Sequence, residues 1–411
     1  MSILINTTLV KEMILHLHRY GASADRIEGA VSEVATRLGL NAQVMASATG
    51  AWLSVIDPTD PERPITHILR LSPGSVDLGK LCDADMIAEQ VGRGEITSEE
   101  ALSKLRELDQ PDKSWENILT LFCCAAASGA VPALFAGTGY IDLFASWGLG
   151  FLAGCFFLLA GKFKRFGEAS EALVAFFVAL TASLIHHFLA PLSMNVVVVA
   201  GLIALMPGLS LTTAVAELSS GQLTAGMARL GGSLVVLVKL TLGTVLAFGV
   251  VKFFGLSSGK VVERLSTLPE TVRTFALLAG AFSFAGLFKA KKEHAFLVAG
   301  SVLTGHFIAQ FVQGESAGML GMLPTGILVS GIFITLLSNI FSTFFHRPGA
   351  VIRLPGIIML VPGSIGFKAG QSLWSDQLSA GGDLFMLAFA TVVALLAGIL
   401  IGNMIWPARR L

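Results

Sequence analysis

The main pattern along this chain is a succession of apolar stretches that begins near residue 118. Each stretch is about 20 residues long, which is the length that an α-helix needs to cross the hydrocarbon core of a bilayer. The pattern predicts ten membrane-spanning helices, near residues 118–137, 143–161, 170–190, 194–216, 228–251, 272–288, 294–313, 318–341, 351–370 and 383–405. We therefore expect a polytopic α-helical membrane protein.

Residues 1–117, which we call the head, have a mixed pattern that is typical of a small α+β domain. Helices are expected near residues 8–20 and from Asp25, and alternating apolar and polar residues predict strands at 43–48, 51–56 and 66–71. Two more helices are expected, one around 76–91 and one after Thr97, which begins a capping-box pattern with Glu100. The second helix has six apolar residues on one face: Ile27, Ala30, Val31, Val34, Ala35 and Leu38.

One motif of the apolar region occurs twice. Residues 201–230 align without a gap with residues 356–385, at a constant offset of about 155 residues. The copies share Pro207-Gly208 and Pro362-Gly363, which lie inside apolar stretches. Proline removes a backbone donor and glycine lowers helix propensity, so each stretch predicts a helix that is interrupted at membrane depth. Such residues often only kink packed helices, but paired interruptions in two halves indicate a transporter's substrate site.

The number of spans in each half predicts how the two halves are related. Five spans per half is an odd number, so the second half enters the membrane from the opposite side. We predict a ten-helix, 5+5 inverted repeat with broken helices, made of residues 118–256 and 257–411, which follows the head at 1–117. The fourth and ninth helices then run antiparallel, cross near the midplane and enclose the substrate.

Composition and charge support a membrane protein and give it an orientation. The chain is 54% hydrophobic and 14% charged, which is too apolar for an ordinary soluble protein. The head has 18 acidic residues against 11 Lys and Arg, and the remainder has 10 against 17. Lys and Arg accumulate in alternate connections, which predicts that the head is cytoplasmic, although the loop at 252–273 does not fit. The N-terminus shows no signal-peptide pattern, and no metal-ligand spacing or disulfide framework is expected among the four cysteines.

Ionisable residues inside the predicted spans are candidates for the substrate site, because they are costly there. Lys239 lies in the middle of the fifth span, and Lys368 follows the second Pro-Gly pair. Either lysine would suit a carboxylate-bearing substrate. Alternatively, Lys368 reaches the outer interface, and Lys239 pairs with Glu217.

Further polar residues lie near the two interruptions. His306, in the seventh span, titrates near neutral pH and suits proton coupling, although a lone histidine is more often only hydrogen-bonded. Asn195, Glu217, Gln222 and Gln377 are expected at the substrate site. Gln377 is the repeat mate of Gln222, and an alternative is that such matched residues cap the ends of the broken helices.

Three other features bear on function. Asp25, Arg26 and Glu28 either place acids at the start of a helix or dock the head onto the membrane domain. The pairs Gly150-x-x-x-Gly154 and Gly366-x-x-x-Gly370 allow close helix contact and are consistent with a homo-oligomer. The sequence has no phosphate loop, no convincing nucleophile and base pair, and no basic aromatic surface for nucleic acid, so we expect neither an enzyme nor a cofactor.

The head sequence resembles that of a known family. The string from Tyr20 to Glu28, with the following helix that ends in Arg-Leu-Gly-Leu, looks like the N-terminal signature of the threonine/serine exporter family. The repeated Leu-x-Pro-Gly looks like that family's two membrane modules, which in some bacteria are separate chains that together export succinate. The resemblance implies a ten-helix inner-membrane exporter, with a cytoplasmic head, for small amino acids or small dicarboxylates.

We therefore predict a secondary transporter that works by alternating access and is driven by protons, since no nucleotide-binding motif is present. A succinate exporter, a channel, and a membrane sensor or scaffold with a ligand-binding head are the alternatives.

Overall fold

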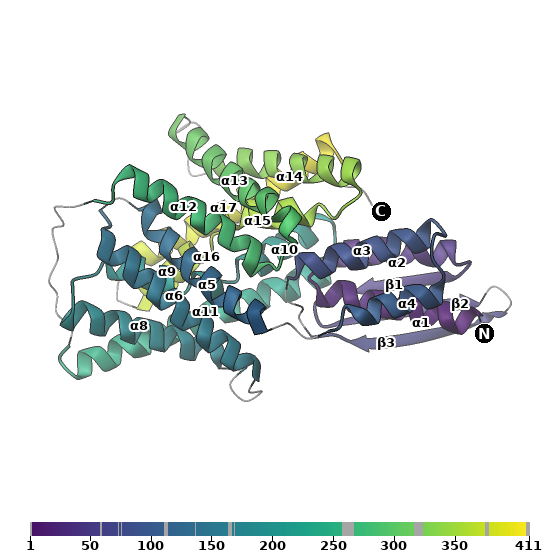
Figure 1. Ribbon diagram of the computed structural model, residues 1–411, viewed down its shortest axis with the longest axis horizontal. Coiled ribbons are helices and arrows are strands. Elements are labelled where there is room, and N and C mark those ends of the chain that lie inside the picture. Colours follow the sequence, from purple (N-terminus) through teal and green to yellow (C-terminus); the bar gives the residue numbers. More distant parts are fainter. Residues whose placement is uncertain are drawn as a thin grey trace.

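The computed structural model describes residues 2–57, 60–72, 74, 76–110, 114–135, 137–162, 167, 169–256, 267–315, 324–374 and 378–407. The described chain is mostly helical, with one small sheet near the N-terminus. Figure 1 shows the head at one end of the long axis and a large helical bundle at the other. The two parts share a continuous hydrophobic core, in which Leu81 of the head is joined by Phe284 and Phe288 of the bundle.

The head is the α+β domain that the sequence predicts. Its elements are α1 (Ser2–Arg19), α2 (Ala24–Arg37), β1 (Asn41–Ala46), β2 (Gly50–Asp57), β3 (Asp60–Arg70), α3 (Leu78–Gly92) and α4 (Ser98–Glu107). The strands form an antiparallel sheet in the order β1-β2-β3. Ala51, Leu53 and Val55 alternate toward the buried face of the sheet, as a half-buried strand requires. The capping box of Thr97 and Glu100 is confirmed, with both of its hydrogen bonds formed.

The bundle contains two successive series of helices. The first is α5 (Ser114–Ala130) with η1 (Val131–Leu134), α6 (Tyr140–Lys162), α8 (Ser170–Phe188), α9 (Met194–Gly201) with η2 (Ile203–Leu205), α10 (Gly208–Ser219) and α11 (Leu223–Phe253). The second is α12 (Glu270–Leu287), η3 (Lys292–His294), α13 (Ala295–Glu315), α14 (Thr325–Phe345), α15 (Ala350–Ile358), α16 (Gly363–Trp374) and α17 (Leu378–Ile405).

Fewer helices qualify as membrane spans than the ten that the sequence predicts. Among the described residues, eight are long and apolar enough, or nine when the bent pair 194–201 and 203–219 is counted as one span. The predicted sixth span corresponds to α12, which is not among them and has Glu270 and Arg273 in its first turn. The predicted eighth span begins at 318, outside the described residues, whereas α14 begins at Thr325.

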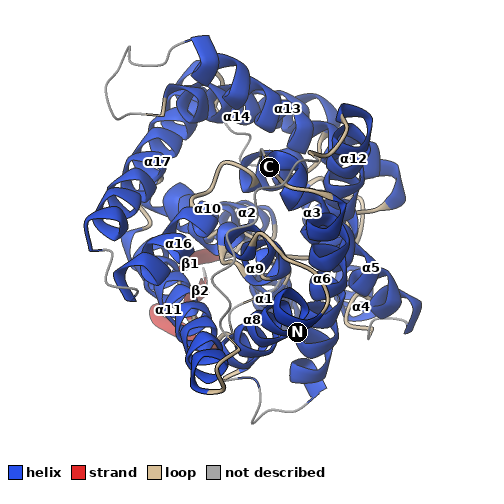
Figure 2. Cartoon of the chain, turned by 90° about the vertical axis from the view of Figure 1, so that its left-hand side faces the viewer, coloured by secondary structure: helices blue, strands red, loops and turns tan. Residues whose placement is uncertain are grey.

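Both Pro-Gly pairs interrupt a helix, as the sequence predicts. The first interruption separates η2 from α10, and the chain bends by 49° a few residues earlier, between 194–201 and 203–219. The second separates α15 from α16, but residues 350–372 stay straight enough to count as one span. Figure 2 shows α9 and α10 toward the middle of a ring that includes α8, α11, α17, α14, α13 and α12.

The two series pack in matching ways. In each series the last helix contacts the third helix and the second half of the broken helix. In the first series α11 contacts α8 and α10, and in the second series α17 contacts α14 and α16. Between the series, α16 contacts α11, α10 contacts α17, and α5 contacts α12. Gly243 and Gly398, also about 155 residues apart, each let a backbone carbonyl approach, from Ala172 and Leu328 respectively.

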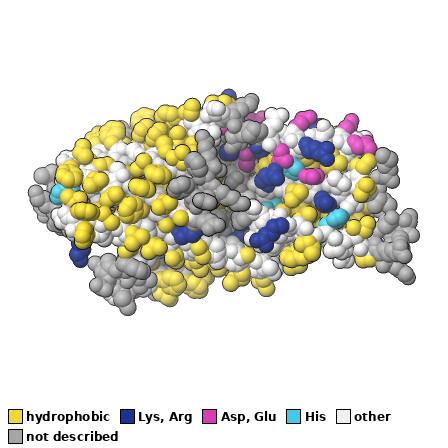
Figure 3. Space-filling view, turned by 90° about the horizontal axis from the view of Figure 1, so that it is seen from below, with side chains coloured by type: hydrophobic (Ala, Val, Ile, Leu, Met, Phe, Trp, Pro, Cys, Tyr) yellow, Lys and Arg dark blue, Asp and Glu magenta, His cyan; other side chains and the backbone are white. Residues whose placement is uncertain are grey.

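The two parts of the molecule differ in surface chemistry. Figure 3 shows hydrophobic side chains over the helical bundle and most of the charged side chains on the head. Large apolar side chains such as Phe144, Phe275 and Phe311 are exposed on the outside of the bundle. A bundle that is apolar on its outside is the arrangement that a bilayer requires.

Candidate functional site

The two helix interruptions lie against each other. A Cβ atom built on Gly208 would lie 3.7 Å from the side chain of Ile358, the last residue of α15. A Cβ atom on Gly363 would lie 3.6 Å from Cβ of Met206, which precedes the first interruption. The first interruption thus packs on Ile358, which ends the helix before the second interruption, and the second packs on Met206, which precedes the first. We call this contact the break crossing.

A cavity of about 140 Å³, the break cavity, opens beside the break crossing. Gly208 and Gly363 line it, together with His306 from α13 and Ser364 from α16. The other lining side chains are almost all apolar and come from α5, η1, α9, η2, α12, α13 and α15. A mostly apolar cavity with a few polar groups is the usual form of a small-molecule site.

A second cavity, of about 370 Å³, lies on another side of the first interruption, and we call it the lateral cavity. Pro207 lines it, as do Glu171 at the start of α8 and Val76 of the head. The two cavities share four apolar residues, which we call the apolar barrier: Ile203, Met206, Phe284 and Ile358. The barrier includes Met206 and Ile358, which form the break crossing, so the interruptions separate the two cavities.

The two candidate lysines lie in different surroundings. The Nζ atom of Lys368 lies 4.6 Å from the centre of the Phe135 ring, and Phe135 lines the break cavity. A cation over an aromatic face is stabilised by the ring electrons. Lys239 instead lies 3.4 Å from Glu171, and Glu217 pairs with Arg229, so the alternative that Lys239 pairs with Glu217 is wrong. Lys368 therefore lies beside a residue that lines the break cavity, and Lys239 beside one that lines the lateral cavity.

Glu217 contacts the head rather than the break cavity. Its fully buried carboxylate accepts hydrogen bonds from the Ala24 backbone N–H at 3.1 Å and from Arg229 Nε at 3.0 Å. Gln222 donates to Glu28 at 2.5 Å, and the other oxygen of Glu28 accepts from the Ala46 backbone N–H. Docking of the head is thus confirmed as a role of Glu28.

The remaining candidates are not brought to the break crossing. Asn195 is exposed near the start of α9, at the opposite end of that helix from the interruption. Gln377 lies outside the described residues. Arg26 forms an ion pair at 2.5 Å within the head, with Asp85 of α3. Of the sequence candidates, Gly208, Gly363 and His306 therefore line the break cavity, and Lys368 lies over its lining residue Phe135. Pro207 and Pro362 immediately precede the second halves of the broken helices.

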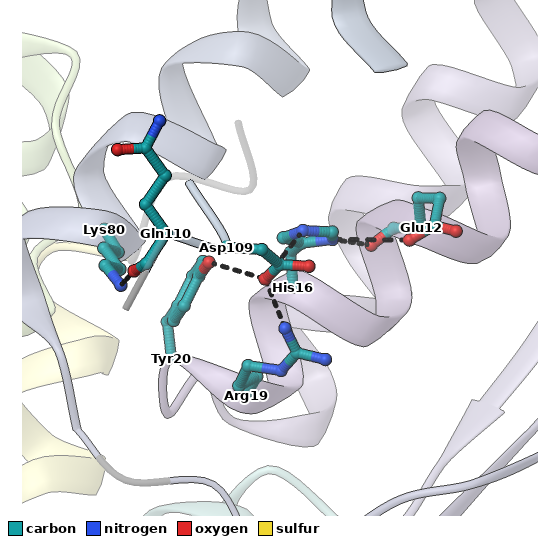
Figure 4. A network of polar contacts seen from close by, with 7 residues as sticks. All are labelled: Glu12, His16, Arg19, Tyr20, Lys80, Asp109 and Gln110. Carbon is teal, nitrogen blue, oxygen red and sulfur yellow. Dashed lines mark hydrogen bonds and ion pairs between the residues drawn. The ribbon is translucent and has the colours of Figure 1, made fainter. Parts of the chain in front are cut away.

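The connection from the head to α5 is held by a polar network, which Figure 4 shows. Asp109 accepts a hydrogen bond from Arg19, lies 3.4 Å from Nε2 of the buried His16, and receives the Tyr20 hydroxyl at 3.5 Å. Burial, followed by the nearby Asp109 charge, raises the pKa of Tyr20 to about 12. Lys80 donates to the Gln110 carbonyl at 3.1 Å. The end of α1 is thereby fixed to the segment that leads into the membrane.

Sequence reasoning missed the contacts between the head and the second half of the bundle. The backbone N–H groups of Leu78 and Gly79 donate to the carbonyls of Phe288 and Lys289, at 2.8 and 3.1 Å. Lys291 forms an ion pair with Asp83 at 2.5 Å. The only sequence signal is Gly79, where a Cβ atom would lie 2.8 Å from the Lys289 carbonyl oxygen. Backbone contacts of this kind depend on the fold and not on residue type.

Comparison with known proteins finds two family models and several distant relatives. A model described as a threonine/serine exporter matches residues 13–251, and one described as Threonine/Serine exporter, ThrE, matches residues 273–405. Pheromone-regulated membrane protein 10 of Debaryomyces hansenii is 21% identical over 97% of this chain and 41% of its own length. The protein of that name from Pichia sorbitophila is 22% identical over 88% of this chain and 36% of its own.

An uncharacterized protein of Schizosaccharomyces pombe is 20% identical over 77% of this chain and 38% of its own length. The chain thus spans about two fifths of the length of these curated relatives. No solved structure matches the chain.

Proposed function

Because the chain belongs to the threonine/serine exporter family, we propose that it is a proton-coupled secondary transporter that exports small, carboxylate-bearing amino acids of the threonine and serine type by alternating access. The observation that carries this proposal is the break crossing, where two interrupted helices separate two cavities. A site between two gates that open in turn is what alternating access requires.

The proposed architecture is a 5+5 inverted repeat of ten crossings, α12 included. The matching helix contacts of the two series support it, as does the pair Gly243 and Gly398. Supporting evidence for α12 comes from the head, which contacts both the α10–α11 connection at Gln222 and the α12–α13 connection at Lys291. Both connections lie on the head side of the bundle. The chain must therefore cross away from the head in α11 and cross back in α12, which makes α12 a crossing.

We place the head in the cytoplasm and the bundle in the inner membrane. The head contacts the connections that carry the positive charges expected on the cytoplasmic side, including Lys291 and Arg347. The C-terminal end of the chain also returns to that side, because Trp406 bonds through its carbonyl to Asn339 and through its indole to Thr343, near the end of α14.

The substrate in this proposal occupies the break cavity, with its carboxylate toward Lys368. The cation there already lies over an aromatic ring, at the edge of an otherwise apolar space. An amino acid and a dicarboxylate such as succinate share the carboxylate, so succinate export is the second candidate.

Transport by reconstituted protein tests the site. In liposomes we expect counterflow of labelled threonine or serine, and loss of most of it in Gly208→Leu, because the larger side chain fills the break crossing. Gly208→Ala is the matched control, since a Cβ atom there meets Ile358 only at an ordinary 3.7 Å. Equal counterflow in the two variants would show that the substrate does not pass this point. Counterflow with succinate alone would favour the second candidate.

His306 is the proposed proton-coupling group, because it is the titratable side chain among the described residues that line the break cavity. In His306→Gln we expect counterflow, which needs no driving force, to persist while accumulation driven by a pH gradient is lost. Accumulation at the wild-type rate would exclude this residue from coupling.

A further inference from the structure

A third cavity, of about 100 Å³, lies between the head and the bundle, and we call it the interface cavity. The head contributes the turn and first residues of α2, from Gly21 to Arg26, and Asp85 of α3. The bundle contributes residues of α10, α14, α15 and α17. Neither part of the molecule forms this cavity alone, and it shares no lining residue with the break cavity.

We propose that the interface cavity is a second binding site, which takes a small α-amino acid as a zwitterion and thereby holds the head against the bundle. The inference deepens the proposed function, on which it rests for the substrate class. It assigns a ligand to the head segment from Tyr20 to Glu28, which the break cavity does not use.

The charges of the lining favour a ligand with one positive and one negative group. Four charged residues line the cavity, and two of them, Arg26 and Asp85, form an ion pair with each other at 2.5 Å. Asp25 and Arg353 are left, and within the described part of the chain neither forms an ion pair closer than 4 Å. Asp25 is exposed and Arg353 is half-buried. A ligand ammonium toward Asp25 and a ligand carboxylate toward Arg353 would give each of them a close partner of opposite charge. A dicarboxylate would instead set a negative charge against Asp25.

The neutral polar groups of the lining favour a ligand that donates hydrogen bonds. Thr212 donates its hydroxyl to the Gly208 carbonyl, Ser338 to the Gly349 carbonyl, and Ser342 to the Asn339 carbonyl. A hydroxyl has only one proton to donate, so in any further hydrogen bond these three oxygens must act as acceptors and the ligand as the donor. An ammonium group and a side-chain hydroxyl supply such donors.

The size and position of the cavity suit a small metabolite. A volume of about 100 Å³ has room for roughly three water molecules, which a single amino acid the size of serine or threonine can replace. Thr212 and Thr213 lie on α10, one turn beyond the first interruption. A ligand bound here therefore joins the head to the second half of a broken helix, so that cytoplasmic amino acid controls whether the head stays docked.

Calorimetric titration of the full-length protein in detergent tests the site with three ligands: L-serine, 3-hydroxypropionate, which lacks the ammonium, and ethanolamine, which lacks the carboxylate. We expect L-serine to bind at least tenfold more tightly than the other two. Asp25→Asn should weaken L-serine at least tenfold and leave 3-hydroxypropionate unchanged, and Arg353→Gln should weaken both acids and leave ethanolamine unchanged.

The matched controls are Glu33→Gln and Arg37→Gln, which remove the same charges from the exposed side of α2 and should bind as wild type. If Arg353→Gln does not fold, Ala350→Leu, which fills the cavity without a change of charge, should abolish the same binding. The proposal would be overturned if the wild type did not bind L-serine. It would also be overturned if Asp25→Asn bound L-serine with wild-type affinity and Arg353→Gln or Ala350→Leu, as separate variants, did so too.

A further variant separates this proposal from the transport function. Gly208→Leu should lose counterflow and retain binding at the interface cavity. If the wild type binds L-serine through Asp25 and Arg353 but transports no amino acid, the proposed function fails and the site stands. If it transports serine and the interface variants bind as wild type, the site fails and the function stands.

Discussion

At the scale of single residues, the polar groups that the sequence predicts inside the membrane divide between two roles. His306 lines the break cavity and Lys368 borders it, whereas Glu217 and Gln222 bind the head. Residue type and depth identified all four as unusual, because a polar group in a bilayer needs a partner. The contact of Glu217 with the head was not predictable, since its partner there is the Ala24 backbone amide, 193 residues away, whose position depends on how the head docks.

His18 extends this docking contact and gives it a pH dependence. Its ring is buried, and Nε2 lies 3.2 Å from the Ala48 carbonyl. Burial, followed by the positive charge of Arg229 in the bundle, lowers the pKa of His18 below its ordinary value of 6.5. The unfolded protein then binds a proton that the folded protein rejects. Stability is therefore present above pH 6.5 and lost as the pH falls through 6.5 toward the folded pKa.

Thermal unfolding of the purified protein between pH 7.5 and 5.5 measures this effect. We expect the melting temperature of His18→Asn to fall less over this interval than that of the wild type. His346→Asn is the control, because His346 is exposed and asparagine tolerates its left-handed backbone conformation. Identical pH profiles for wild type and His18→Asn would contradict the assignment.

At the scale of elements, the sequence predicted the interruptions but not their shapes. In the first half the chain bends by 49° between 194–201 and 203–219, just before the Leu-x-Pro-Gly motif, whereas in the second half 350–372 counts as one span. The motif determines only which backbone donor is lost, and the packing of each half-helix determines the angle. The ten-span count stays a prediction, since Glu270 and Arg273 make α12 less apolar than the other long helices of the bundle.

The two Gly-x-x-x-Gly pairs also serve contacts between elements of the same chain. A Cβ atom on Gly150 would lie 2.2 Å from the Ser128 hydroxyl oxygen, and one on Gly154 would lie 3.2 Å from Cβ of Cys124, so α6 packs closely on α5. Gly366 and Gly370 lie against Leu237 and Thr241 of α11 in the same way. A homo-oligomer stays a prediction, but these four glycines are engaged within the chain.

Alanine substitution in α6 tests the packing. Gly150→Ala should destabilise the protein by about 1–3 kcal/mol, because the new methyl group overlaps Ser128 and the Cys124 carbonyl. Gly148→Ala, two residues earlier in the same helix, has nothing within 4 Å of its new methyl group and should be neutral or slightly stabilising. Denaturant unfolding in detergent measures both, and equal stability of the two variants would show that α6 and α5 do not pack so closely.

At the scale of the whole molecule, the head contacts both halves of the bundle on one side. It binds the first half through Glu217 and Gln222 and the second through Phe288, Lys289 and Lys291. Any movement of one half against the other must therefore change some of these contacts. The division into head and bundle was predictable from hydrophobic pattern, whereas the docking was not, because surfaces that meet across domains have no periodicity of their own.

The break crossing is a second place where the two halves of the bundle meet, and a disulfide can hold them together there. Cysteines at positions 206 and 363 would have Cβ atoms about 3.6 Å apart, which is within the range of natural disulfides. If the halves separate at the apolar barrier during transport, oxidised Met206→Cys/Gly363→Cys should lose counterflow, and dithiothreitol should restore it. The single variants should transport under both conditions. Full counterflow by the verified disulfide form would mean that substrate passes without opening the crossing, because a covalent link there prevents residues 206 and 363 from separating.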